Sequence, residues 1–393
     1  MRSFGFSDEQ VTRIVAALIA QELRDSGRRH FDPLSASTWN AETVLGEGGV
    51  ELGAEALKRC VARVARFFGQ DARDLQGGAL SKIGDLSSLT AAAARAKLVT
   101  MSFTPAGQPD DAAGCSHRAD DVFLDAAAAA NLIYGRRRLV SLVSPHSYFG
   151  FVLTVVTPNL QRIETFDARP LDPQELQNAL QFGDALLATP TLWRYLLQEG
   201  LSAPDNAMGI FFGEPMPPTT SAEMRQAGFA AQRELYGSTE NGLIGWRDSP
   251  TDPFSLFDHW AREGDAMVRA AASGESLVTE PMDILSWSAE RQFMLAGRRD
   301  GAVQIGAVNV FPERIAALLQ EHPSVDACMI RIRPYQNGAN RVIAHVKLSA
   351  GLDPIESTMR DIDHWCRDHL RNLERPSVFH FEETLDGLDA AYD

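Results

Sequence analysis

The segment that decides the fold reads Leu235-Tyr236-Gly237-Ser238-Thr239-Glu240-Asn241-Gly242. An apolar run that ends in a Gly-Ser-Thr turn can present backbone amides and hydroxyls to an anion. The carboxylate that follows, Glu240, can hold a magnesium ion against phosphate oxygens. The segment is also compatible with an ordinary hydroxyl-rich β-turn, because short Gly/Ser/Thr motifs are common. Its interpretation therefore depends on the surrounding sequence.

Several spaced motifs surround this segment and occur in a fixed order along the chain. The upstream motifs are Pro145-His146-Ser147-Tyr148-Phe149-Gly150-Phe151, Gly183-Asp184 and Thr191-Leu192-Trp193-Arg194. The downstream motifs are Gly242-Leu243-Ile244-Gly245-Trp246-Arg247, Asp283, Gly297-Arg298-Arg299-Asp300, Val308-Asn309-Val310-Phe311-Pro312 and His322-Pro323-Ser324-Val325. A set of spaced motifs is far more specific than any single one.

In this order and at these separations, the motifs resemble the core motifs of the adenylate-forming superfamily of ligases. The chain is most similar to the phenylacetate-CoA ligases and, more closely, to the short 4-coumarate-CoA ligases that serve photoactive yellow protein. The resemblance covers roughly residues 139–375. It implies an α/β fold, in which a large N-terminal adenylate-forming domain with mixed sheets and helices precedes a small α+β C-terminal domain.

Hydrophobic periodicity predicts a helical N-terminal region of the large domain over residues 1–100. Ser7 and Gln10 have the spacing of a capping box, which predicts the start of a first helix. A second helix is predicted over residues 54–68.

The pattern of apolar residues changes after this helical region. Short apolar runs separated by helical stretches predict a mostly parallel or mixed sheet with helices packed on it, forming the α/β core of an AMP-binding domain over residues 101–299. After a break near residues 297–300, alternating strand and helix patterns predict a small, mobile α+β domain over residues 300–393.

Composition excludes several classes of partner. The chain has 393 residues and a formal net charge of −15, which argues against nucleic acids and anionic membranes as partners. Its apolar stretches are shorter than the roughly 20 residues of a membrane span. The first ten residues lack a basic-then-apolar signal pattern, so we expect a cytoplasmic protein.

The resemblance implies a nucleotide site at the opening segment, with Thr239 and Glu240 as the catalytic residues. Thr239 would contact the α-phosphate, and Glu240 would bind a magnesium ion. Tyr236 would stack on adenine, whereas Asp283 and Arg298 would hold the ribose hydroxyls; a surface ion pair is the alternative for these last two residues. The implied nucleotide-binding residues are Gly213, Glu214, Pro215, Tyr236, Gly237, Ser238, Asp283 and Arg298.

The resemblance also implies an acyl pocket and a hinge. The implied pocket residues are His146, Ser147, Phe149 and Gly150, and the hinge of the small domain is Asp300. The family histidine aligns with Ser147, so His146 is an offset neighbour that we interpret as pocket-lining or structural. The glycine and arginine of the family's CoA tunnel align with Ala307 and Gly306, and a methyl group at Ala307 would narrow the pantetheine path.

The sequence differs from the family pattern at two places that would contact the phosphates of ATP. The family's phosphate loop corresponds to residues 103–113, where Pro109 lacks an amide hydrogen and Asp110 and Asp111 place negative charge beside a triphosphate. The loop's lysine aligns with Ala113. The lysine of the rotating domain falls at about Tyr392, and no lysine follows Lys347.

Three functional hypotheses follow. The first is an enzyme that activates an aryl carboxylic acid, 4-coumarate- or hydroxybenzoate-like, with ATP and Mg²⁺ for transfer to CoA or to the phosphopantetheine thiol of a carrier protein. The second is a catalytically degenerate relative that acts as a nucleotide-, acyl- or carrier-protein-binding subunit, for example of another ligase. The third is an enzyme that keeps only the thioester-forming half of the reaction.

Overall fold

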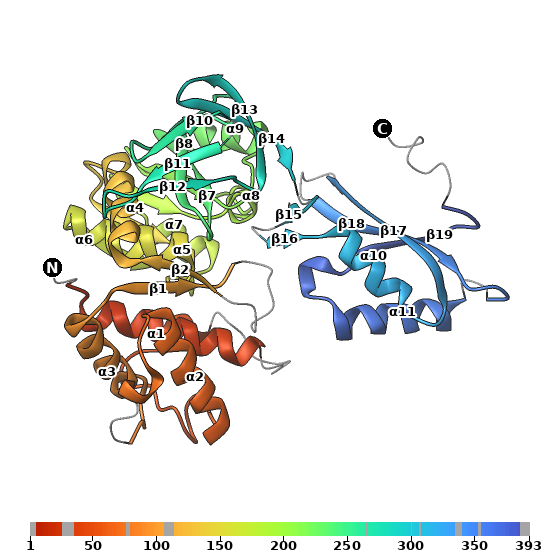
Figure 1. Ribbon diagram of the computed structural model, residues 1–393, viewed down its shortest axis with the longest axis horizontal. Helices are drawn as coiled ribbons and strands as arrows, with labels where there is room; N and C mark the ends of the chain where they lie inside the picture. The colour runs from red at the N-terminus through yellow and green to blue at the C-terminus, as the bar shows by residue number, and fades with distance from the viewer. Residues whose placement is uncertain are drawn as a thin grey trace. The chain divides into compact units, whose positions relative to one another are not determined.

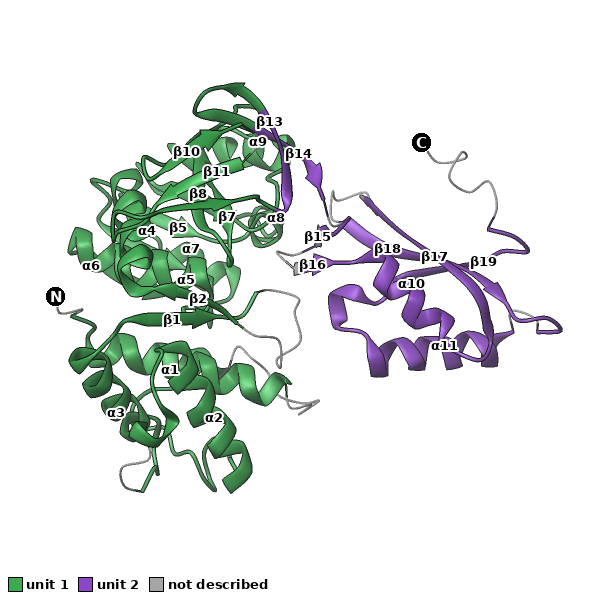
Figure 2. Ribbon diagram, viewed as in Figure 1, with its two compact units in different colours: residues 1–281, 287–293 green, residues 282–286, 294–393 purple. Residues whose placement is uncertain are grey.

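The computed structural model describes residues 5–25, 35–75, 79–105, 114–264, 266–299, 301–305, 308–334, 340–352 and 355–385. The chain divides into two compact units (Figure 2). The first unit comprises residues 1–281 and 287–293, and the second comprises residues 282–286 and 294–393. The predicted domain limits after residues 100 and 299 stay predictions.

The first unit begins with three helices, and α1 packs against the other two (Figure 1). They are α1 (Asp8–Asp25), α2 (Ala54–Phe67) and α3 (Ile83–Ala96), with short 3-10 turns at η1 (Ser35–Thr38) and η2 (Ala72–Leu75). The predicted capping box is confirmed, because Gln10 N–H donates to Ser7 Oγ and Ser7 N–H donates to Gln10 Oε1, both at 3.1 Å. The apolar stripe of α1 is buried, which explains why this segment is helical.

A mixed sheet forms the centre of the first unit, as the sequence predicts. Its strand order is β13-β14-β9-β8-β7-β6-β5-β3-β4, and of β13 and β14 only the residues within 287–293 belong to the first unit. The five strands from β4 to β7 run parallel, whereas β7, β8, β9 and β14 are joined antiparallel. The strands are β3 (Arg138–Ser141), β4 (Glu164–Asp167), β5 (Asp184–Leu187), β6 (Met208–Phe212), β7 (Ala231–Ser238), β8 (Gly242–Arg247), β9 (Phe254–Leu256), β13 (Asp283–Ala289) and β14 (Gln292–Arg298).

Helices connect the parallel strands of this sheet. They are α5 (Tyr148–Phe151), the π-helical turn η3 (Val152–Val156), α6 (Thr157–Gln161), α7 (Pro173–Ala179), α8 (Pro190–Gln198) and α9 (Pro218–Gln226), and α4 (Ala119–Leu132) precedes the first of these strands, β3. Trp193 of α8 is fully buried and lies in one hydrophobic cluster with Leu186 of β5 and Phe211 of β6. Within the described residues, we find no helix that combines the length and apolarity needed to cross a membrane.

Two smaller sheets of the first unit were not predicted from the sequence. One is the hairpin of β1 (Thr100–Phe103) and β2 (Cys115–Arg118), and the other joins β10 (Trp260–Glu263), β11 (Ala266–Ala270) and β12 (Ser276–Thr279). Three of the four residues of β10 and of β12 are exposed. Such strands lack the alternation of apolar and polar residues that makes a half-buried strand recognisable.

The second unit has the α+β composition that the sequence predicts. Its elements are β15 (Val303–Ile305), β16 (Val308–Val310), α10 (Pro312–Gln320), β17 (Val325–Pro334), β18 (Asn340–Leu348), α11 (Glu356–His369), η4 (Asn372–Glu374) and β19 (Val378–Phe381). Helices α10 and α11 cover one face of the β17-β18-β19 sheet (Figure 1). Ile315 of α10 and Ile362 of α11 share its core with Val346 of β18.

A buried ion pair stabilises the parallel part of the first unit's sheet. Asp184 accepts hydrogen bonds from Arg138 Nη2 at 2.7 Å, Arg138 Nε at 3.2 Å and Gln181 N–H at 2.8 Å. We expect Asp184→Ala to lower the free energy of unfolding of the first unit by about 3 to 5 kcal/mol, because Arg138 is left as an uncompensated buried charge. Urea denaturation followed by tryptophan fluorescence measures this loss.

The matched control is Glu55→Ala, which removes a carboxylate from the exposed pair with Lys58. That variant should unfold at the same urea concentration as the unmodified protein. Equal midpoints for Asp184→Ala and Glu55→Ala would contradict the stabilising role of the buried pair.

Candidate functional site

The predicted phosphate turn lies where β7 turns back into β8. The register of the two strands shifts between Tyr236 and Gly237, and Asn241 N–H donates to Ser238 Oγ at 3.1 Å. A Cβ at Gly237 would collide with the carbonyl of Gly242, so only glycine permits this close approach of the two strands. The local sequence therefore folds into a tight, internally hydrogen-bonded turn.

Glu240 lies at the tip of this turn with its side chain exposed. The residues present fit magnesium as a nucleotide-borne ion, since Mg²⁺ is commonly held by one or two carboxylates together with substrate phosphates. The described residues contain no group of three or more His, Cys, Asp or Glu that could hold a metal alone. Burial, together with the charge of Glu240, raises the pKa of the nearby Cys115 thiol to about 11, so this thiol stays protonated. The catalytic roles of Thr239 and Glu240 stay predictions.

Tyr236 precedes the turn and is largely buried. Its ring contacts those of Phe254 and Phe293, each at a centroid distance of 5.4 Å. These contacts hold the ring against the first unit's sheet, and its stacking on adenine stays a prediction.

The segment of Gly213, Glu214 and Pro215 follows β6, the neighbour of β7 in the sheet. Gly213 has a φ of 93°, and Glu214 Oε1 accepts a hydrogen bond from Thr191 N–H at 2.6 Å. The bond joins this segment to the first turn of α8, where unpaired helical amides favour a carboxylate.

Asp283 and Arg298 both belong to the second unit. Arg298 Nη1 lies 3.5 Å from Asp283 Oδ1, and their side chains are only 15% and 18% exposed. The ion pair offered as the alternative interpretation is therefore present, although it is largely buried. The ribose-binding role stays a prediction.

Several predicted features fall outside the described residues. They are the hinge residue Asp300, the phosphate-loop positions Pro109, Asp110, Asp111 and Ala113, the tunnel positions Gly306 and Ala307, and Tyr392.

The predicted acyl-pocket residues form the start of α5. Ser147 caps the helix, since its Oγ accepts from Gly150 N–H at 3.0 Å, and a Cβ at Gly150 would collide with the carbonyl of Ser144. Phe149 stacks on Phe212 with a centroid distance of 4.6 Å and an interplanar angle of 9°. Because Phe212 directly precedes Gly213, this ring pair brings the predicted acyl pocket beside the predicted nucleotide-binding segment that begins at Gly213.

His146 is partly buried, and its Nδ1 lies 2.6 Å from Ser144 Oγ. Burial, together with the charges of Arg24, Arg169 and Arg63, lowers the pKa of His146 to about 3. The imidazole is therefore neutral at neutral pH. A neutral, hydrogen-bonded ring agrees with its interpretation as a structural or pocket-lining residue.

Sequence reasoning missed a buried polar network behind the predicted phosphate turn between β7 and β8. Its centre is Asp125 of α4, which is 0% exposed. Asp125 Oδ2 accepts hydrogen bonds from Tyr148 O–H at 2.6 Å and from Leu243 N–H at 2.7 Å. One oxygen thus joins the predicted acyl-pocket segment to the strand that follows the predicted phosphate turn. The available signal was two carboxylates, Asp121 and Asp125, on the buried side of an alanine-rich helix.

The other oxygen of Asp125 faces the side chains of Arg269 and His259. Arg269 Nη2 donates to Asp125 Oδ1 at 2.7 Å, and His259 Nε2 lies 3.0 Å from the same atom. Arg269 Nη1 also donates to the carbonyl of Asn241 at 2.6 Å. The guanidinium therefore connects the buried carboxylate to the phosphate turn itself.

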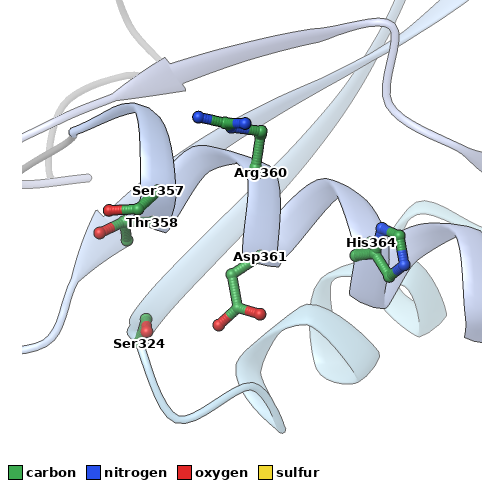
Figure 3. Close-up of a pocket in the computed structure, with 6 residues that line it drawn as sticks. All are labelled: Ser324, Ser357, Thr358, Arg360, Asp361 and His364. Atoms are coloured by element: carbon green, nitrogen blue, oxygen red, sulfur yellow. The ribbon is translucent and has the colours of Figure 1, made fainter.

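A polar hollow of about 540 Å³ lies on the second unit (Figure 3). It is lined by Ser324, Ser357, Thr358, Arg360, Asp361 and His364. Asp361 points toward the side of Ser324, whereas Arg360 points the other way (Figure 3). None of these side chains is a predicted site residue.

Gly242 has a φ of 80°, and a Cβ there would collide with Asp125 Oδ2 and crowd Arg269 Nη1. We expect Gly242→Ala to lower the free energy of unfolding by about 3 kcal/mol or more, because steric displacement of a buried ion pair adds to the backbone strain. Chemical denaturation provides the measurement.

Gly274→Ala is the matched control, since Gly274 also has a positive φ, of 86°, but no atom lies within 4 Å of the position that its Cβ would occupy. Its free energy of unfolding should fall only by the backbone strain of roughly 1 to 2 kcal/mol. If both variants lost the same stability, the close packing at Gly242 would be refuted.

The lowered pKa of His146 predicts a pH-dependent stability. The folded protein binds the imidazole proton less readily than the unfolded chain, whose histidines have a pKa near 6.5. The contribution is therefore fully present above about pH 6.5 and is lost as the pH falls toward 3. We expect His146→Asn to flatten the decline of Tm between pH 6 and pH 4, whereas His364→Asn, at an exposed histidine, leaves the decline unchanged.

A decline that stays equally steep in His146→Asn would show that this imidazole protonates alike in both states.

No protein-family model matches the chain. The chain is 28% identical over 379 residues to the 4-coumarate–CoA ligase of Halorhodospira halophila, and the alignment covers 95% of each protein. This relationship therefore extends over nearly the whole length of both proteins.

Solved structures show the same fold. The amide bond synthetase McbA from Marinactinospora thermotolerans matches with a TM-score of 0.55 and 18% identity, over 69% of this chain and 63% of that one. A malonyl-CoA ligase bound to methylmalonyl-CoA and AMP matches with a TM-score of 0.57 and 14% identity, over 72% and 70% of the two chains. The predicted resemblance to the adenylate-forming ligases and the predicted α/β fold class are confirmed.

Proposed function

We propose that this chain is an acid–thiol ligase that activates an aryl carboxylic acid with ATP and transfers the acyl group to CoA. The observation that carries the proposal is the tight turn after Tyr236, which exposes Glu240 and lies one strand away from the segment at Gly213. The sequence relationship to a 4-coumarate–CoA ligase over 95% of both chains supports the same reaction class.

An aromatic substrate is supported by the ring pair at the start of α5. Phe149 and Phe212 are parallel, and both are less than a tenth exposed. An aryl or aryl-acrylic acid can add to such a stack through offset or edge contacts. We therefore propose a 4-coumarate- or hydroxybenzoate-like acid.

The reaction would proceed in two balanced steps. First, a carboxylate oxygen of the acid attacks the α-phosphorus of ATP, and pyrophosphate leaves with the bonding electron pair. Thr239 would donate a hydrogen bond to an α-phosphate oxygen, and Glu240 would hold a magnesium ion that neutralises charge on the phosphates. Next, a thiolate attacks the acyl carbon, forming the thioester and releasing AMP.

CoA is the acceptor we favour, since the relative at 28% identity is named a CoA ligase. The phosphopantetheine thiol of a carrier protein presents the same chemical group. A panel of both acceptors would distinguish them after the first step has been established.

The second candidate is a binding subunit with impaired adenylation. Asp110 and Asp111 place negative charge in the sequence that corresponds to the family's phosphate loop, and no lysine follows Lys347. The loss of one electrostatic donor costs about 2 to 4 kcal/mol of transition-state stabilisation. Such a subunit would bind a nucleotide, an acyl group or a carrier protein without forming the adenylate.

ATP–pyrophosphate exchange with Mg²⁺ and a panel of aryl acids separates these candidates. We expect exchange that depends on the acid, with a roughly hundredfold loss in Glu240→Ala, because the ligand of the metal is removed. Glu263→Ala removes another exposed carboxylate, from β10, and should exchange at the unmodified rate.

Absence of exchange in the correctly folded, unmodified protein would exclude adenylation and favour the binding subunit. Equal rates in Glu240→Ala and Glu263→Ala would exclude Glu240 from the reaction.

A further inference from the structure

We infer that Asp125 is a positioning residue that holds the predicted phosphate turn and the predicted acyl-pocket segment in one fixed relation, with Arg269 and Tyr148 as its partners. The inference rests on the proposed function of these two segments and extends it to residues that do not touch substrate. It follows from buried contacts within the first unit alone.

Each oxygen of Asp125 serves a different part of the arrangement. Oδ2 accepts from Tyr148 O–H and Leu243 N–H, whereas Oδ1 accepts from Arg269 Nη2. Tyr148 lies between Ser147 and Phe149 of the acyl-pocket segment, so the first bond fixes that segment. The bond from Leu243 N–H fixes β8, the strand that leaves the predicted phosphate turn.

Further contacts hold the turn itself. Arg269 Nη1 donates to the carbonyl of Asn241, and Thr279 Oγ1 donates to Asn241 Oδ1 at 3.0 Å. On the other side, His117 Nε2–H donates to the carbonyl of Thr239 at 2.6 Å. Glu240 is therefore exposed between two residues whose carbonyls are both hydrogen-bonded to buried side chains.

His117 extends the arrangement to the β1–β2 hairpin. Burial lowers the pKa of His117, which keeps the ring neutral with one nitrogen free to donate. Its ring contacts that of Tyr148 at a centroid distance of 4.7 Å, and Phe103 of β1 contacts Tyr148 at 5.0 Å. Tyr148 is thus the ring at which the hairpin meets the acyl-pocket segment.

The chemistry of Asp125 makes the arrangement sensitive to one atom. Tyr148 O–H, Leu243 N–H and Arg269 Nη2 all donate to its two oxygens, and a carboxylate can accept on both sides. An asparagine can accept on only one side, because its amide nitrogen would face another donor. Asp125→Asn therefore keeps the size of the side chain but must release either Leu243 or Arg269, and both of these hold the side of the turn that runs from Asn241 to Leu243.

Hydrogen–deuterium exchange of the full chain tests the inference without relying on catalysis. In Asp125→Asn we expect amides of residues 239–245 to exchange at least tenfold faster, since a hydrogen bond to a charged group typically contributes about a factor of ten or more. Amides of residues 325–334 in the second unit should keep their rates. Asp258→Asn, at a fully exposed aspartate, is the matched control.

Tyr148→Phe is a milder variant that removes only the hydroxyl and keeps the ring contacts. We expect faster exchange at residues 147–151 in this variant, and unchanged rates in Tyr134→Phe, whose tyrosine is 80% exposed. Uniformly faster exchange over the whole first unit would overturn the inference, because it would indicate general destabilisation. Unchanged rates in both segments would overturn it as well.

A second readout links the arrangement to the proposed reaction. If adenylation occurs, the Mg²⁺ concentration for half-maximal pyrophosphate exchange should rise about tenfold in Asp125→Asn, since displaced Glu240 holds the ion less well. A purely structural role would lower the amount of active protein and leave this concentration unchanged. If the unmodified protein shows no pyrophosphate exchange, the proposed function fails, and hydrogen exchange still decides the positioning role.

Discussion

The carboxylate of Asp125 is a negative charge with no access to solvent, so the protein must compensate it internally. Compensation comes from α5, β8 and β11, which are joined at this one side chain by Tyr148, Leu243 and Arg269. The charge is tolerated only when all three elements are in place. The interaction that makes burial possible therefore also fixes the geometry of the turn that follows Tyr236 and of the segment that begins at His146.

Local patterns were sufficient to predict the elements whose stability is local. The capping box at Ser7, the fully buried strands β5 and β6 and the helices of the second unit all follow from residues close together in the sequence. Strands β10 and β12 could not be predicted, because most of their residues face solvent. The turn at Tyr236 could be identified from its motif. Asp125 could not, because its partners Leu243 and Arg269 lie 118 and 144 residues away in the sequence.

Two carboxylates near this turn differ through their surroundings. Asp125 is buried with every oxygen occupied by donors, whereas Glu240 is exposed at the tip of the turn. The buried group suits positioning, and the exposed group suits a transient metal–phosphate ligand.

Calorimetric binding of a 4-coumaroyl sulfamoyl adenosine, a stable analogue of the aryl adenylate, tests the central claim most directly. The account predicts one-to-one binding at least about a hundredfold tighter than that of AMP, because the analogue fills the nucleotide and aryl sites together. Binding no tighter than AMP would contradict the claim that the turn after Tyr236 and the segment at Phe149 form one site.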